Sequence, residues 1–148
     1  MSISPPKKSG WGSVLTAILI LAILSTVAAL GYVVTNPAEE SFTEFYLLGL
    51  DGTADNYPGQ LRAGEPGKVI VGIINREHET TTYRLQITVD GAVNREITPV
   101  TLQHGEKWEE AISFLPGHTG DRQKVEFLLY RQEQTEVYRS LLLWVDVR

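Results

Sequence analysis

Residues 83–91 read YRLQITVDG and carry a clear strand pattern. Apolar side chains occupy every second position from Tyr83 to Val89, and polar side chains fill the positions between them. A period of two is typical of a β-strand with one buried and one solvated face. Asp90 and Gly91 follow directly, and both residue types accept the positive φ angles of a two-residue hairpin turn. The stretch therefore predicts a strand that ends in a β-hairpin.

Strand patterns recur along the rest of the chain after residue 41. The segment VIVGII at 69–74 is apolar on both faces, as expected of a strand in the middle of a sandwich. Pro99 marks the strand after the hairpin as short or at a sheet edge. About seven strands without a helical period between them predict an all-β, immunoglobulin-like antiparallel β-sandwich over residues 42–148. Besides 83–89, the predicted strands are 42–50, 69–74, 93–97, 108–114, 125–129 and 137–147.

A long uncharged run precedes this domain. Residues 14–34 read VLTAILILAILSTVAALGYVV. As a helix they would rise roughly 32 Å, which matches a hydrocarbon core of about 30 Å. Trp11 and Tyr32 stand near the two ends, where amphipathic rings anchor a helix at the membrane interface. The sequence therefore predicts a transmembrane helix at 11–34, after an N-terminal tail at 1–10 and before a linker at 35–41.

The charges flanking this helix predict its orientation. Lys7 and Lys8 are the basic residues before it, whereas all 18 acidic residues lie at or after Glu39. The positive-inside rule then places the N-terminus in the cytoplasm and the C-terminal domain outside the cytoplasmic membrane. Pro37 disfavours helical geometry at the residue before it, so the helix is expected to end in the linker.

A cleaved signal peptide is the alternative to a retained anchor. Small residues at Val27-Ala28-Ala29 could form a cleavage site after the basic tail. The apolar run continues to Val34, which is longer than a usual signal core and favours a retained anchor. Both alternatives place the domain outside the cytoplasm.

One face of the predicted helix carries small side chains. Ala22, Ser25, Thr26 and Ala29 follow the spacing i, i+3, i+4 and i+7. A stripe of this kind allows close approach of a second helix in lipid, although Ala, Ser and Thr are also common in spanning helices. The stripe is a candidate packing surface for a membrane partner.

The composition excludes several classes of function. The chain of 148 residues has a formal net charge of −5, and most of its basic residues are mixed with acidic ones after the helix. Nucleic-acid binding needs a basic face that releases counterions, so it is not expected. The absence of cysteine excludes disulfides and thiolate metal sites, and the domain must be held by its core alone.

Several stretches taken together resemble a known family. They are FTEFYLLG (42–49), NYP (56–58), VIVGIINREHETTTYRLQI (69–87), Trp108, KVEFLLY (124–130) and YRSLLLWVDV (138–147). This combination is similar to domain of unknown function 1616, a family of archaeal and bacterial membrane proteins. The resemblance implies a β-domain of the cell envelope and supplies no activity. Many similar members carry several membrane helices before the domain, whereas this chain has one.

Two stretches contain residue types found in metal sites. His78-Glu79 begins like the zinc motif HExxH, but Thr82 stands where the second histidine belongs, and the segment leads into a strand. Glu77, His78 and Glu79 are therefore interpreted as a solvated turn. The loop 51–56, DGTADN, has oxygen ligands for calcium but lacks the alternating acidic pattern of an EF-hand. We predict no metal site and no cofactor.

Four residues are candidates for a structural or binding role. Asn75 and Tyr83 flank the turn between two strands, and we expect Asn75 to bond backbone groups while Tyr83 packs below it. Trp108 and Trp144 could form a carbohydrate-stacking surface, although large aromatic residues of a sandwich more often lie in its core.

The sequence contains no nucleophile elbow and no gathered triad, so no catalytic residue is predicted and an enzyme is not expected. The remaining prediction is a membrane-anchored interaction module of the cell envelope. Its expected partner is a membrane or surface protein, with a homo-oligomer as a further option. The alternative is an ectodomain that binds a glycan, a lipid precursor or calcium, or that acts as an enzyme.

Overall fold

A computed structural model of the chain describes residues 2–3, 10–35 and 40–148. Lys7, Lys8, Pro37 and Glu39, which support the predicted orientation and the predicted end of the helix, lie outside the described residues. The chain divides into two compact units, Met1–Glu40 and Ser41–Arg148. Each unit is described by itself.

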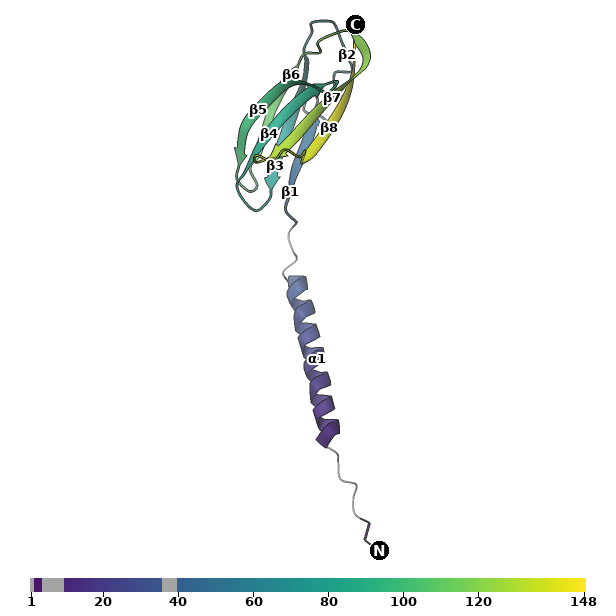
Figure 1. The fold of residues 1–148 in the computed structure, drawn as a ribbon, viewed down its shortest axis with the longest axis vertical. Helices are drawn as coiled ribbons and strands as arrows, with labels where there is room; N and C mark the ends of the chain where they lie inside the picture. Colours follow the sequence, from purple (N-terminus) through teal and green to yellow (C-terminus); the bar gives the residue numbers. More distant parts are fainter. Residues whose placement is uncertain (1, 4–9, 36–39) are drawn as a thin grey trace. The chain divides into compact units, whose positions relative to one another are not determined.

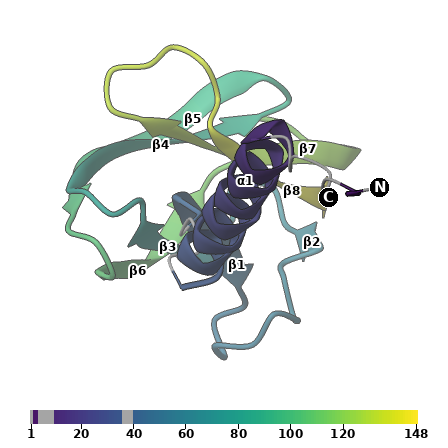
Figure 2. The ribbon, with the colours of Figure 1, turned by 90° about the horizontal axis from the view of Figure 1, so that it is seen from below.

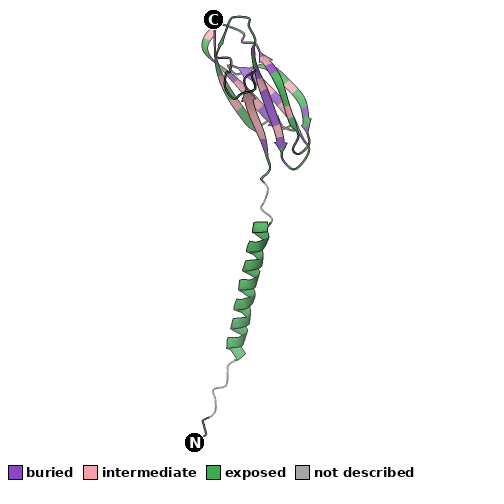
Figure 3. Ribbon diagram, turned by 180° about the vertical axis from the view of Figure 1, so that it is seen from behind, coloured by how far each residue is buried: buried purple, intermediate pink, exposed green. Residues whose placement is uncertain are grey.

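The first unit contains one helix, α1 (Gly10–Thr35), of 26 residues. Its hydroxyl side chains bond back to carbonyl groups of the same helix: Thr16 to Gly12, and Ser25 and Thr26 to Ala22. These bonds give the hydroxyl groups a hydrogen-bond acceptor, which the hydrocarbon core of a membrane could not provide. None of its side chains is buried within the chain, as the exposed colour of the helix in Figure 3 indicates. The helix is long and apolar enough to cross a membrane, a property that it shares with signal sequences.

The second unit is a sandwich of two sheets (Figures 1 and 2). One sheet has the order β1-β3-β6 and the other the order β2-β8-β7-β4-β5. The pairing of β2 with β8 is parallel, and the other pairings are antiparallel. The predicted immunoglobulin-like sandwich is therefore confirmed. The strands are β1 (Phe42–Leu48), β2 (Gln60–Leu61), β3 (Gly67–Arg76), β4 (Thr81–Val89), β5 (Ala92–Leu102), β6 (Lys107–Phe114), β7 (Gly120–Arg131) and β8 (Arg139–Val147).

The hairpin between β4 and β5 forms as its sequence predicts. Asp90 and Gly91 both have positive φ angles, 48° and 82°. Strand β5 lies at a sheet edge, one of the two alternatives that Pro99 predicted, and it runs beyond the predicted end at residue 97 to Leu102. An edge strand tolerates Pro99 because its outward side needs no backbone N–H donor.

The core fills the space between the two sheets. Buried positions alternate with less buried ones along β4 and β7 (Figure 3). The middle of β3, from Val69 to Asn75, has no exposed position. The rings of Phe114 and Phe127, one from each sheet, meet edge to face with centroids 6.3 Å apart. The largest fully buried side chains are Tyr83, Phe114, Phe127, Ile73, Leu85, Ile87, Ile112, Leu129, Val69, Val71, Val125 and Val145.

The two tryptophans of the domain belong to different sheets. Trp108 on β6 is half-buried and packs against the core. Trp144 on β8 is 45% exposed, so its assignment to the core was wrong. The residue shares the outward face of β8 with Leu142, whereas Val145 and Val147 point inward. Because the two rings lie on separate sheets, they do not form the shared carbohydrate-stacking surface that was considered.

Substitution of the two tryptophans should separate their roles. Trp108→Ala should lower the free energy of unfolding by about 2 kcal/mol, because a half-buried aromatic side chain loses part of its core contact. Trp144→Ala should lower it by less than about 1 kcal/mol, as is usual at the surface. Urea-induced unfolding of the full chain in mild detergent, followed by circular dichroism, measures both values. A larger loss for Trp144→Ala than for Trp108→Ala would contradict this assignment.

Candidate functional site at the β1 end of the sandwich

Several segments far apart in the sequence meet at the end of the sandwich where β1 begins. Strand β1 is antiparallel to β3, so Thr43 lies opposite Asn75 near the end of β3. Strand β4 is antiparallel to β7, so Tyr83 lies opposite Arg131. The segment before β8 returns to the same end. This convergence brings the polar residues of four chain segments together.

These residues form a hydrogen-bonded group, the Glu77 cluster, made of Thr43, Glu77, Tyr83, Arg131 and Tyr138. The Thr43 hydroxyl donates to Glu77 Oε1 at 2.7 Å, and the Tyr138 hydroxyl donates to the same oxygen. Arg131 Nη1 donates to Glu77 Oε2 at 3.2 Å. Because the single hydroxyl proton of Thr43 goes to the carboxylate, Tyr83 must donate to Thr43 across their 2.7 Å contact. The cluster links both sheets through one carboxylate.

The Glu77 side chain is almost completely buried, with 2% of its surface exposed. Burial alone would raise the pKa of Glu77, but the hydrogen bonds from Tyr138 and Thr43, together with Arg131, outweigh burial and hold this pKa below its usual value. Burial and the bond to Glu77 raise the pKa of Tyr138. At neutral pH the carboxylate is therefore ionised and accepts bonds on both oxygens. A general acid or base needs a pKa near the working pH, and the lowered pKa of Glu77 does not favour that role.

The earlier interpretation of Glu77 as part of a solvated turn was wrong. Its neighbours His78 and Glu79 are exposed, whereas Glu77 points inward. The partners Thr43, Arg131 and Tyr138 are 34, 54 and 61 positions away in the sequence. No local sequence pattern therefore indicates that Glu77 is buried. The cluster is the part of the site that sequence reasoning missed.

Asn75 stabilises the same turn through hydrogen bonds to backbone groups. Its side chain is fully buried, and Oδ1 accepts the Glu77 N–H at 2.8 Å. Its Nδ2 donates to the carbonyl groups of Glu79 and Leu102, each at 2.7 Å. The residue thus bonds backbone groups at the turn, as expected of it, and Tyr83 is fully buried.

Two histidine rings stack on the surface of this end. The rings of His78 and His104 have centroids 4.4 Å apart, and the His78 N–H donates to His104 Nδ1 at 3.1 Å. The segment that begins like HExxH forms the turn between β3 and β4, not a helix. The described residues contain no group of three or more His, Asp or Glu side chains that could hold a metal ion.

The loop 51–56 uses its oxygens internally. Asp51 Oδ1 accepts bonds from the N–H and hydroxyl groups of Thr53, and Oδ2 accepts a bond from Asn56. These bonds lower the pKa of Asp51, the bond from Asn56 most strongly. The loop has the contacts of an ordinary turn.

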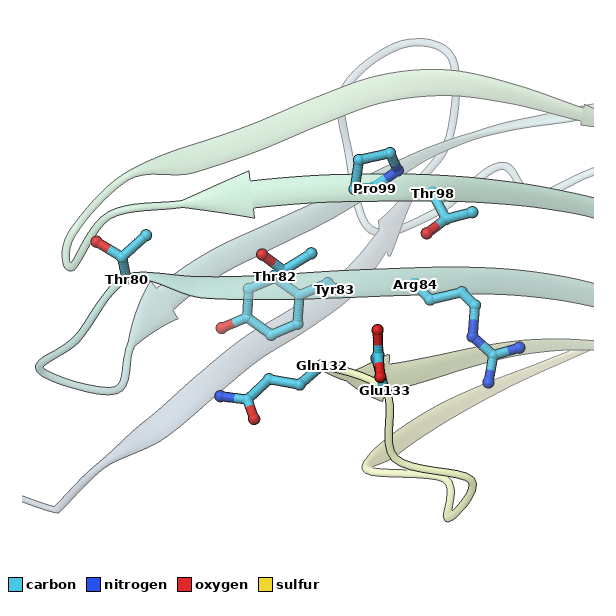
Figure 4. Close-up of a pocket in the computed structure, with 8 residues that line it drawn as sticks. All are labelled: Thr80, Thr82, Tyr83, Arg84, Thr98, Pro99, Gln132 and Glu133. Atoms are coloured by element: carbon cyan, nitrogen blue, oxygen red, sulfur yellow. The ribbon is translucent and has the colours of Figure 1, made fainter.

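A shallow pocket of about 680 Å³ lies beside the Glu77 cluster (Figure 4). Most of its lining residues are polar, and they come from β4, β5 and the segment that follows β7. Tyr83 contributes little surface, because it is fully buried. The lining residues are Thr80, Thr82, Tyr83, Arg84, Thr98, Pro99, Gln132 and Glu133.

The residues predicted on the helix lie far from this site in the sequence. Trp11 and Tyr32 stand close to the two ends of α1 and are 71% and 70% exposed. Ala22, Ser25, Thr26 and Ala29 are exposed along the helix. Their roles as interface anchors and as a packing stripe remain predictions.

The sequence that forms the Glu77 cluster matches a known family. Residues 36–146 match the family described as domain of unknown function DUF1616. The chain belongs to this family. The DUF1616 match covers the whole sandwich except its last residues, so the predicted resemblance is confirmed. None of the curated proteins matches the chain.

The fold of this DUF1616 domain is similar to that of a CARDB domain from Pyrococcus furiosus. A crystal structure of that domain in complex with di-metal ions has a TM-score of 0.55 and 12% identity, and the match covers 74% of this chain and 90% of that one. A solution NMR structure of the same domain has a TM-score of 0.53 and 14% identity, with coverages of 73% and 97%. At such identities the likeness concerns the fold alone.

Proposed function

We propose that the chain is a membrane-anchored module of the cell envelope whose sandwich lies outside the cytoplasm and binds a neighbouring membrane or surface protein. The observation that carries this proposal is an uncharged helix of 26 residues followed directly by a β-sandwich without cysteine. A helix of this length spans a bilayer of about 30 Å. The basic tail before it and the acidic domain after it favour export of the domain.

The polar groups of the domain favour binding over catalysis. Its most deeply buried carboxylate, Glu77, is held by Thr43, Tyr138 and Arg131 and is almost closed to solvent. Buried groups that satisfy one another stabilise a scaffold, whereas catalytic groups need an open face toward the substrate. The loops and sheet edges of a sandwich are common binding surfaces.

Protease accessibility tests the anchor and its orientation. Protease added to sealed cells should remove the domain from its helix, while a cytoplasmic control protein stays intact. A variant in which Lys7 and Lys8 are replaced by glutamate should reduce the exported fraction, because positive charge holds the N-terminus inside. Full protection of the domain in sealed cells, with cleavage after lysis, would rule out the proposed location.

The pocket beside the Glu77 cluster supports an alternative, the binding of a small polar ligand. Its threonines, Arg84 and Gln132 offer the hydrogen-bonding groups that an envelope sugar needs. A ligand that binds only the folded state raises the melting temperature. Thermal scans of the full chain in detergent with peptidoglycan sugars, and separately with calcium, decide between the two functions. A saturable rise that Arg84→Ala abolishes would favour the ligand-binding function.

A further inference from the structure

One sheet edge of the domain is paired over only part of its length. Strand β2 pairs with β8 only at Asp146 and Val147. Within the described part of the chain, the same side of β8 has no partner strand from Arg139 to Val145 (Figure 1). An open strand edge presents unpaired backbone groups to any strand that can approach it.

The backbone groups of this edge can be assigned from the bonds to β2. The N–H groups of Asp146 and Arg148 donate to the carbonyl groups of Gly59 and Leu61. Successive residues of a strand direct their N–H and C=O groups to opposite sides. Ser140, Leu142 and Trp144 therefore direct theirs to the open edge.

Between Ser140 and Val145 this edge carries no charged side chain, and most of its side chains are apolar. Residues 140–145 read SLLLWV, and Leu142 and Trp144 are 49% and 45% exposed. Natural sheets protect an open edge with charges or proline. The other edge strands carry such residues: Glu44 on β1, Arg95, Glu96 and Pro99 on β5, and Lys107, Glu109 and Glu110 on β6. On β8 the charged residues Arg139 and Asp146 flank the segment 140–145, and only that segment lacks this protection.

We infer that the β8 edge pairs antiparallel with the β8 edge of a second copy of this chain. The open window runs from Arg139 to Val145, and its centre is Leu142. A twofold axis at this centre places Leu142 opposite its own copy and Ser140 opposite Trp144. These are the residues with outward backbone groups, so about six inter-chain hydrogen bonds can form.

The side chains agree with this register. Leu141 lies opposite Leu143, both half-buried against the core, so the pair covers the open side of the apolar layer. Arg139 lies opposite Val145, and no two like charges face each other. A register that extended further would collide with β2 at Asp146. Isologous pairing about a twofold axis is also the commonest form of homodimer.

The inference goes beyond the proposed function, because the edge would pair whether or not α1 is retained in a membrane. The protease experiment tests the location of the domain and leaves the dimer untouched. Failure of one proposal is therefore distinguishable from failure of the other.

The test uses single substitutions in the full chain, purified in mild detergent and measured by light scattering across a range of concentrations. Leu142→Lys places like charges on the axis and should raise the dissociation constant of the dimer at least about tenfold. Val93→Lys is the matched control, because Val93 is 62% exposed on the opposite edge strand β5 and should leave the constant unchanged. Circular dichroism checks that both variants stay folded.

A crosslink gives an independent readout, since the chain has no cysteine of its own. Leu142→Cys should form an inter-chain disulfide under mild oxidation, because hydrogen-bonded antiparallel pairs have Cα atoms about 5.5 Å apart. Val93→Cys should remain unlinked. A monomer at every concentration, a dimer that Leu142→Lys leaves intact, or equal crosslinking of the two cysteine variants would each overturn the inference. The second of these outcomes would point to pairing through α1.

Discussion

Asn75→Ala should lower the free energy of unfolding by about 3 to 4 kcal/mol, because buried backbone groups would lose their partners at about 1 to 3 kcal/mol each. The side chain accepts the N–H of Glu77 and donates to the carbonyl groups of Glu79 and Leu102. Alanine can replace none of these bonds, and a buried site admits no water freely. Urea-induced unfolding of the full chain in detergent measures the loss.

Asn94→Ala provides the matched control. Asn94 also bonds a backbone donor and a backbone acceptor, both of Leu115, but it lies in an exposed position. Water can satisfy these groups after substitution, so the expected loss is below about 1 kcal/mol. Equal losses of unfolding free energy for the two variants would mean that burial does not increase the contribution of the Asn75 hydrogen bonds to stability.

The contrast between these asparagines indicates what the sequence could predict. Asn75 ends the apolar segment 69–74 and precedes the strand that begins near Tyr83, so its place at a turn follows from local patterns. The alternation along β4 and the Asp90-Gly91 turn likewise depend on neighbours in the chain. Such features are visible because the period of two and the turn chemistry are local properties.

Features that depend on distant partners were not predictable in this way. Strand β2 has two residues and exists because Gly59 and Leu61 accept bonds from β8. Trp144 alternates as its strand does, but both faces of 141–147 are largely apolar, so the pattern does not reveal which face is inward. Glu77 is a charged residue in a polar turn, and its burial follows from partners on β1, β7 and the segment before β8. A single sequence contains no signal of these contacts.

Glu77→Ala should lower the free energy of unfolding at neutral pH by about 3 kcal/mol, because removal of one member of a buried ion pair leaves its partners without compensation. Arg131 would keep a positive charge that is 30% exposed, which moderates the loss. The hydroxyl groups of Thr43 and Tyr138 would lose their common acceptor. Thermal or urea-induced unfolding of the full chain in detergent measures the change. Glu79→Ala, two residues along the same turn and exposed, should cost less than about 0.5 kcal/mol.

Acid titration gives the same pair of variants a second readout. The folded-state pKa of Glu77 lies below the ordinary value of 4.5, so folding favours the ionised carboxylate. The resulting stability is present above pH 4.5 and is lost as the pH falls through the lower, folded-state pKa. Glu77→Ala removes this contribution, so the stability of the variant should fall less steeply in acid than that of the wild type. Glu79→Ala leaves the Glu77 carboxylate and its partners in place, so the contribution of Glu77 to the acid dependence should remain. Glu77→Ala could instead lose stability at neutral pH but keep the full acid dependence of the wild type. Glu77 would then act by packing, and the charge of its carboxylate would contribute nothing to the connection of β1, β4 and β7.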